Sequence, residues 1–374
     1  DGKCYRVENA PAKGYKACDI TATESKVTYQ DRKFENDFYT LVFDENYELA
    51  SIFDKRRNRE LVANGARANR FRTYEDLPVR NDAWDINADY KDKYWDILSV
   101  ENVAFKTEGE RAGIEITRKY LTSTLKQTVW LYNGTARIDF DTEIDWDIPH
   151  VLLKVLFPLN LNTNKAICDV QFGNVERSTH KNTSWDRARF EVCAHKYVDI
   201  CEGSFGVALL NDCKYGYGVD KTEVSLTLIK CATYPDYTAD KGKHVFTYSI
   251  YLHDGYSDRE EVIWESYLLN NPLQAVKACK GEKGLPEEYS LLSCENNNVI
   301  VETIKQAEDG EEIVVRLFET TNKQTEVRLN VGFDFSAIYF TDLLEREEKE
   351  VSFEGRQVTF TVKPFEIVTL VFKK

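Results

Sequence analysis

Methionine is absent from the 374-residue sequence, histidine occurs only five times, and no two cysteines have the CxxC spacing. His180 and His195 have no second His or Cys at ligand spacing, so a metal site built from this chain is a poor interpretation of either residue. Hydrogen bonding within the fold explains His180 better. Because the first residue is Asp1 and not Met, we expect the chain to begin inside a longer protein.

Long apolar runs are missing too. No stretch approaches the roughly 18 apolar residues of a membrane-spanning helix, and the first part of the chain lacks the basic and apolar regions of a signal peptide. Acidic residues number 63 against 49 basic ones, for a net charge of -14. Phosphates would be repelled by this charge, so we expect neither a membrane nor a nucleic acid as partner.

The short motifs of common enzymes are absent as well. There is no GxSxG, P-loop, HExxH or dinucleotide fingerprint, so the corresponding nucleophile and phosphate chemistries have no support. A glycosidase needs two carboxylates, but 63 acidic residues make every pair equally available. We therefore assign no catalytic residue to this chain.

The cysteines indicate a compartment. Their number, nine, is odd, and the chain is large. Such usage favours free thiols in a reducing environment over a disulfide framework, which predicts the cytoplasm.

What the sequence does contain is strand alternation. Residues 137–144 alternate charged and mostly apolar side chains, which is typical of a half-buried antiparallel strand. One helix is expected, with Asp258 as N-cap and an end near Asn270. The other predicted strands are 37–43, 48–54, 113–120, 124–132, 151–156, 188–193, 206–210, 224–229, 244–251, 299–304, 312–318, 326–330, 337–340, 357–362 and 367–372.

A stretch rich in Gly, Lys, Glu and Pro, residues 280–288, interrupts this pattern and predicts a domain boundary. The predicted fold class is all-β, with a large sandwich of about 250 residues followed by a small sandwich of the fibronectin-like size class. No fixed repeat is visible, so neither a propeller nor a solenoid is expected.

Three segments are dense in aromatics, carboxylates and turn residues and lack alternation, as ligand-facing loops do. The first, residues 74–86, places Trp84 between Asp82 and Asp85. Sugars stack their C–H bonds on an aromatic ring while carboxylates accept their hydroxyl protons, so this trio suits a carbohydrate. An indole that fills a gap beneath solvated acids explains the trio equally well.

The second segment, residues 172–191, holds a lone histidine among hydroxyls and a Trp-Asp pair. The third, residues 233–244, is punctuated by Pro and Gly and leads into a strand. A solvated loop is the default interpretation of the third.

These segments read YEDLPVRNDAWDI over 74–86, FGNVERSTHKNTSWDRARFE over 172–191 and ATYPDYTADKGKHVFTY over 232–248. In this order they resemble motifs of the C-terminal region of family 38 α-mannosidases of the bacterial and class II type. Further likeness lies at 11–16, 207–217 and 363–370, so the resemblance covers essentially the whole chain. Ser178 stands where the family usually has Pro, which predicts a looser loop before His180, and Lys13 stands where an apolar residue is usual.

The resemblance implies that residues 1–26 finish a preceding small β-domain, 27–284 form a mutarotase-like supersandwich, and 285–374 form a small C-terminal sandwich. It also implies an upstream catalytic domain that binds a divalent metal, expected to be zinc, followed by a helical domain. No cofactor is expected in this chain itself. The implied reaction is hydrolysis of terminal α-mannosides with retention, through a covalent mannosyl-enzyme.

By the same resemblance, this chain contributes walls to the site and is inactive alone. Its partners would be α-mannoside oligosaccharides and its own upstream domains, and a homodimer is compatible with the sequence. Packing of the motifs against the catalytic domain fits the same residues nearly as well as sugar binding. The substrate-binding candidates are Asp82, Trp84, Asp85, His180, Trp185, Asp186, Asp236, Asp240 and His244.

Two other functions stay open. A mutarotase-like fold could work alone as a sugar epimerase with a base and an acid on opposite faces of the sugar. A carbohydrate-binding module would instead bind glycans without turnover. The three functions differ in what the chain does alone: epimerisation, binding, or neither until it is joined to an upstream domain.

Overall fold

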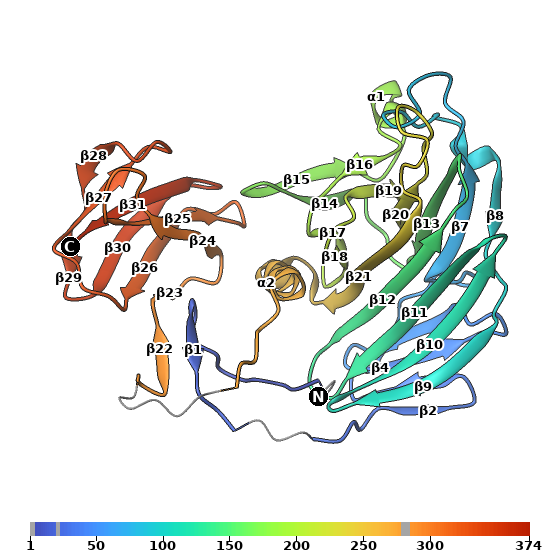
Figure 1. Cartoon of the computed structure of the whole chain (residues 1–374), viewed down its shortest axis with the longest axis horizontal. Helices are drawn as coiled ribbons and strands as arrows, with labels where there is room; N and C mark the ends of the chain where they lie inside the picture. The colour runs from blue at the N-terminus through green and yellow to red at the C-terminus, as the bar shows by residue number, and fades with distance from the viewer. Residues whose placement is uncertain (1–3, 20–22, 278–284) are drawn as a thin grey trace. The chain divides into compact units, whose positions relative to one another are not determined.

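The chain folds into two compact units. The structure, a computed structural model, describes residues 4–19, 23–277 and 285–374 (Figure 1). One unit, the large sandwich, comprises Asp1–Arg6, Ala22–Asp169 and Val175–Pro272. The other, the small sandwich, comprises Val7–Thr21, Val170–Asn174 and Leu273–Lys374.

Three antiparallel sheets build the large sandwich (Figure 1). The nine-stranded sheet contains, in spatial order, β15 (Gly173–Ser178), β14 (Lys165–Val170), β17 (Tyr197–Glu202), β18 (Phe205–Asn211), β21 (Gly242–His253), β12 (Arg137–Trp146), β11 (Ser123–Tyr132), β10 (Arg111–Tyr120) and β9 (Asn102–Glu108). The six-stranded sheet contains β16 (Val192–Cys193), β19 (Gly216–Asp220), β20 (Glu223–Lys230), β13 (Val151–Pro158), β7 (Arg70–Glu75) and β8 (Tyr94–Asp96). The five-stranded sheet contains β2 (Thr28–Gln30), β3 (Lys33–Glu35), β4 (Tyr39–Phe43), β5 (Leu49–Asp54) and β6 (Arg59–Glu60).

The small sandwich has two main sheets. One contains β23 (Leu292–Cys294), β26 (Thr325–Val331), β30 (Gln357–Val362) and β29 (Phe353–Glu354). The other contains β24 (Val299–Gln306), β25 (Ile313–Glu319), β31 (Ile367–Lys373), β27 (Ala337–Thr341) and β28 (Glu347–Glu350). A separate ribbon pairs β1 (Gly14–Lys16) with β22 (Glu288–Ser290), so the early segment of the chain belongs to this unit.

Strand alternation explains the core. In β12 the apolar Ile138, Phe140 and Ile144 are fully buried in the main apolar cluster, as the period-2 pattern requires. Asp139 is also buried, on the other face, because Arg137 binds it and in turn reaches Glu265 of helix α2 (Arg259–Asn270). The helix therefore covers part of the outer face of the nine-stranded sheet.

The all-β prediction is confirmed, and the predicted helix at 258–270 is α2, preceded by a 3-10 turn, η2 (Gly255–Asp258). The strand predicted at 188–193 was wrong for most of its length. Helix α1 (Ser184–Ala188) ends where that strand should begin, and only Val192–Cys193 is strand. A capping box around Thr183 starts the helix and overrides the local strand propensity. The boundary predicted at 284 falls on residues 278–284, outside the described residues, and the one at 26 stays a prediction.

Two further findings concern the described residues. Every cysteine among them is free. No helix in the same part of the chain is long and apolar enough to cross a membrane.

Candidate functional site: a loop cluster at one end of the large sandwich

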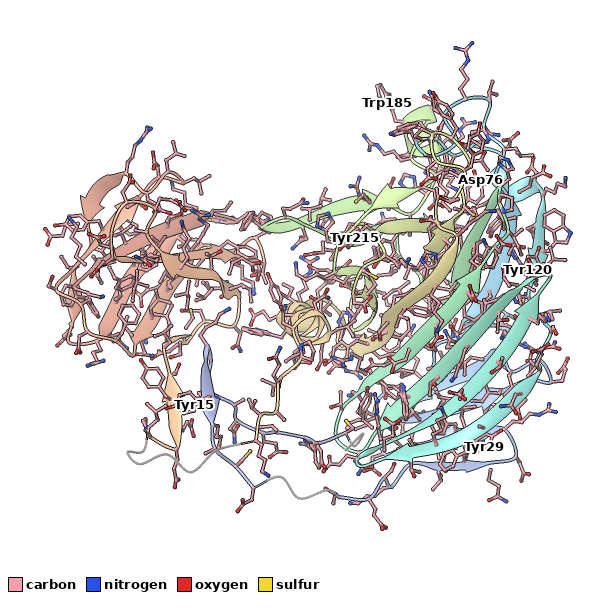
Figure 2. All side chains as sticks on the ribbon, viewed as in Figure 1. Tyr15, Tyr29, Asp76, Tyr120, Trp185 and Tyr215 are labelled. Carbon is pink, nitrogen blue, oxygen red and sulfur yellow. The ribbon has the colours of Figure 1, made fainter. Side chains whose placement is uncertain are left out.

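Three loops gather at one end of the large sandwich, and we call them the loop cluster: loop A (76–93), loop B (179–191) and loop C (231–241). The pairing of strands explains why A and C meet. Glu75, the last residue of β7, lies opposite Val151, and Lys230, the last of β20, lies opposite Leu152. Both strands therefore release their loops at the same sheet edge (Figure 1). Figure 2 shows Asp76 of loop A and Trp185 of loop B at this end.

Asp82 ties loop A to loop C. Its Oδ2 accepts hydrogen bonds from the backbone N–H (2.7 Å) and hydroxyl (3.0 Å) of Thr233, and its Oδ1 accepts the N–H of Tyr234 at 2.8 Å. These bonds, led by the Thr233 N–H, hold the pKa of Asp82 below its ordinary value. The side chain is nearly buried. Asp82 therefore acts as an ionised clamp between loops, and its oxygens face protein donors.

Trp84 lies two residues further along loop A and is 70% exposed. Its ring meets that of Tyr234, which is 56% exposed, with centroids 6.4 Å apart and planes at 62°. Asp85 is exposed, and its Oδ1 accepts only the N–H of Ile86. Loop A thus presents an indole and a carboxylate to solvent from a backbone that Asp82 fixes.

Beneath Asp82 lies a second buried carboxylate. Asp76 is 2% exposed and forms an ion pair with Lys230 through Oδ2, and burial raises the pKa of this carboxyl group. His150 lies close by, with its Nδ1 3.7 Å from Asp82 Oδ2. Asp76 Oδ1 and His150 Nδ1 are buried atoms without a hydrogen-bond partner in the described part of the chain. No sequence pattern indicated that Asp76 or His150 belongs to the site.

In loop B the predicted residues cluster around Asp186. Its Oδ2 accepts the N–H (3.1 Å) and hydroxyl (2.8 Å) of Thr183, and its Oδ1 accepts the Ser178 hydroxyl at 2.9 Å. Hydrogen bonds from Thr183 and then Ser178 lower its pKa. His180 Nδ1 is 3.5 Å from Asp186 Oδ2, while Trp185 is 76% exposed. Asp186 is a cap that organises this loop, and Trp185 is its exposed element.

The Ser178 hydroxyl makes a bond that bears on the looser loop predicted before His180, which stays a prediction. A proline at position 178 has no hydroxyl, so it could not make this contact with Asp186. Serine therefore adds a tether between β15 and α1.

Replacing Thr183 by alanine should fray α1. The substitution removes the side-chain half of the capping box, a change that costs about 1 kcal/mol of local helix stability. We expect faster hydrogen exchange at 184–188 with little change in the urea midpoint of the whole unit. Ser178→Ala is the matched control, since it also removes one bond to Asp186 but leaves the cap. Equal exchange at α1 in Thr183→Ala and the unmodified protein would contradict the role of the cap.

Loop C is closed by its own acids. Asp236 Oδ1 accepts the N–H and hydroxyl of Thr238, both at 2.8 Å, and the Thr238 N–H leads the lowering of the Asp236 pKa. Asp240 accepts the N–H of Lys230 at 3.2 Å. His244 Nε2 lies 2.8 Å from the carbonyl oxygen of Asp240. Asp236 and Asp240 are both exposed, and Asp240 and His244 close the loop onto the strands.

Sequence reasoning missed a buried ion pair between β13 and loop B, whose carboxylate is also bonded to loop A. Lys154 of β13 is fully buried, and its ammonium group donates to Glu191 Oε2 at 2.6 Å and to Thr227 Oγ1 at 2.9 Å. Tyr90, in the short 3-10 turn η1 (Tyr90–Asp92), donates to Glu191 Oε1 at 2.5 Å. Burial lowers the pKa of Lys154 and, with Glu191, raises that of Tyr90. The one signal in the sequence was a lysine amid the apolar run 151–157.

The nine predicted residues therefore fall into two groups, according to whether their side chains contact the protein or solvent. Asp82, Asp186, Asp240 and His244 bind the protein itself, and His180 lies against Asp186. Trp84, Asp85, Trp185 and Asp236 present free surface. Aromatic faces beside carboxylates suit a neutral polyol. In the described ranges, no three His, Cys, Asp or Glu side chains converge to hold a metal ion. The zinc expected from the resemblance belongs to an upstream domain, so this finding does not test that expectation.

The fold and the loop cluster define the chain as an all-β protein with two sandwich units, whose exposed rings and carboxylates suit a sugar. Comparison with known families narrows this class. Residues 34–238 match "Glycosyl hydrolases family 38 C-terminal domain" and residues 298–370 match "Glycosyl hydrolases family 38 C-terminal beta sandwich domain". The chain belongs to glycosyl hydrolase family 38.

Several relatives carry a mannosidase name. The chain is 34% identical to human "Alpha-mannosidase 2C1" over 94% of its own length and 34% of that protein. It is 36% identical to "Alpha-mannosidase G" of Dictyostelium discoideum over 94% of its length and 33% of that protein. The chain therefore spans about a third of these curated relatives. A crystal structure of an alpha-mannosidase from Enterococcus faecalis V583 shares the fold, with TM-score 0.79, 18% identity, and coverage of 93% of this chain and 43% of that one.

Proposed function

We propose that this chain is the C-terminal part of an α-mannosidase that hydrolyses terminal α-mannosides with retention. The observation that carries the proposal is the identity of 34% to a human alpha-mannosidase across 94% of this chain but only 34% of that protein. The nucleophile, the acid/base group and a divalent metal, expected to be zinc, are assigned to a domain upstream of these residues. The metal would supply a Lewis acid for the sugar hydroxyls.

In this proposal the loop cluster shapes or supports the active site. Its exposed members, Trp84, Asp85, Trp185 and Asp236, are the candidates for contact with the mannoside. Its clamped members hold the loops in place, because hydrogen bonds from fixed donors restrict the backbone that carries the exposed side chains. The free cysteines support a cytoplasmic setting.

The test is hydrolysis of an aryl α-mannoside with added zinc, comparing this chain with the full-length protein encoded by the same gene. We expect turnover only by the full-length protein, because the chain alone lacks the nucleophile and the acid/base pair. A rate for the chain that matches the full-length rate would overturn the proposal.

The same samples separate the alternatives. Interconversion of free mannose anomers or epimers by this chain would indicate an epimerase. A full-length protein that binds mannosides but hydrolyses none would indicate a binding module. A homodimer is tested separately, by the sedimentation of the full-length protein.

A further inference from the structure

Two exposed rings on different loops meet edge to face in the loop cluster. The Trp84 indole and the Tyr234 phenol have centroids 6.4 Å apart and planes at 62°, and both are more than half exposed. Apolar area left in water costs free energy in proportion to its size, and contiguous exposed area marks binding sites. Tyr234 was not among the residues that the sequence pointed to.

The backbone beneath both rings is fixed by one carboxylate. Asp82 accepts the N–H of Tyr234 itself on Oδ1 and the N–H of Thr233 on Oδ2. On its own loop, the N–H of Trp84 donates to the carbonyl oxygen of Asn81 at 2.8 Å. The backbone positions that carry the two rings are therefore held by hydrogen bonds that do not use the rings themselves.

We propose that Trp84 and Tyr234 form a two-walled platform for one pyranose ring of an α-mannoside, with Asp82 as the positioning residue of the platform. The choice of mannoside rests on the proposed function. Two tilted ring faces match the C–H surface of a pyranose. Asp85 and Asp236, next to and two residues beyond the rings, each keep one carboxylate oxygen without a partner in the described residues, so each can accept a sugar hydroxyl.

The carboxylates favour a sugar over a protein as the occupant. Charged side chains are depleted at the centre of protein interfaces, because burying them without partners costs free energy. Sugar hydroxyls, in contrast, need acceptors beside the aromatic face. The platform therefore assigns Tyr234 to sugar binding and removes Asp82 from direct contact.

The first experiment is saturation-transfer NMR on the full-length protein encoded by the same gene, with methyl α-D-mannopyranoside as the probe. We expect transfer to the ring C–H protons, and no transfer to mannitol, which has similar hydroxyls but no ring. Trp84→Ala and Tyr234→Ala should each weaken binding about tenfold, since each removes one stacking face. Tyr237→Ala is the matched control: it lies in the same loop, is 77% exposed and should leave binding unchanged.

The second experiment addresses positioning. Asp82→Asn keeps the size of the side chain but places an NH2 group against one of the two backbone N–H donors. We expect binding, measured well below the thermal midpoint, to weaken several-fold, and the indole N–H resonance of Trp84 to shift. Asp89→Asn, an exposed residue of loop A whose side chain caps nothing, should do neither.

The platform is overturned if Trp84→Ala and Tyr234→Ala bind the mannoside as the unmodified chain does. If the variants bind the mannoside normally and, after a protease has cut the linker, this chain no longer stays attached to its upstream domains, the rings serve a protein contact. That outcome also overturns the platform. If the full-length enzyme is active and both variants leave its kcat/KM unchanged, the platform is wrong and the proposed function stands. If binding depends on the two rings but the full-length protein hydrolyses no mannoside, the platform stands and the proposed function is wrong.

Discussion

Replacing Glu191 by alanine will lower the free energy of unfolding of the large sandwich by about 3 to 5 kcal/mol. The carboxylate is the ionic partner of Lys154, which is fully buried, and it also accepts the Tyr90 hydroxyl. Its loss leaves an ammonium group in the interior with Thr227 as its remaining partner. We expect the urea midpoint to fall accordingly. Tryptophan fluorescence measures this unit alone, because all six tryptophans precede residue 265.

The controls separate charge from packing. Lys154→Met combined with Glu191→Gln removes both charges and keeps an acceptor for Tyr90, so the double variant should be far more stable than Glu191→Ala. Glu143→Ala breaks an exposed pair with Lys243 and should leave the midpoint in place. A Glu191→Ala midpoint equal to that of Glu143→Ala would show that the buried pair contributes nothing.

Replacing Glu319 by glutamine will destabilise the small sandwich by about 1 to 3 kcal/mol. Glu319 is fully buried without a cation: Oε1 accepts from Asn298 (3.0 Å) and from the N–H and hydroxyl of Thr321, and Oε2 accepts the N–H of Phe365 at 3.1 Å. An amide has only one acceptor oxygen and would oppose a donor with its NH2 group. Far-UV circular dichroism reports both sandwiches, so the transition that tryptophan fluorescence does not follow belongs to this unit.

The same residue sets an acid limit. Burial opposes ionisation of Glu319, but its hydrogen bonds outweigh burial and hold its pKa below the ordinary 4.5. Because the folded pKa is the lower one, the stabilisation is complete above pH of about 4.5 and is lost as the pH falls through the folded pKa. Glu319→Gln should flatten this dependence, whereas Glu326→Gln, an exposed glutamate of the same sandwich, should not. Parallel acid profiles for Glu319→Gln and the unmodified protein would contradict this role.

Local pattern predicted many of the long strands, because the side chains of a sandwich alternate regardless of what they pack against, but it missed β7, β9, β14, β15, β17 and β19. Residues 137–144 of β12 show this alternation, since their apolar side chains all face the core of the large sandwich. The same logic failed at 188–193. The capping box formed by Thr183 and Asp186 starts a helix that extends to Ala188, where the strand was predicted to begin. Caps depend on single residues, so a window of alternating residues does not report them.

The candidate site was predictable in place but not in role. The motifs located the three loops. Within one motif, however, nothing in the sequence distinguishes the role of Asp82 from that of Trp84. The contacts of Asp82 with Thr233 and Tyr234 show that Asp82 is a clamp, whereas Trp84 is an exposed surface residue. Glu191 ends the second motif and Lys154 lies outside every motif, in β13, so their pairing depends on how β13 lies beside the end of loop B. Such partnerships are set by tertiary structure and have no local signature.

The β1–β22 ribbon has a consequence for synthesis in the cell. Gly14 lies opposite Ser290, and a side chain at position 14 would collide with the Tyr289 carbonyl oxygen, so the two strands approach closely. Because the ribosome makes residues 23–272 between these two strands, the large sandwich can fold while β1 still has no strand to pair with. During translation β1 is an open strand edge, the kind of segment that chaperones shield and that mispairs with a second nascent chain. Substitutions in residues 7–19 would therefore act on a late step of folding, although the ribosome makes these residues before the strands of the large sandwich.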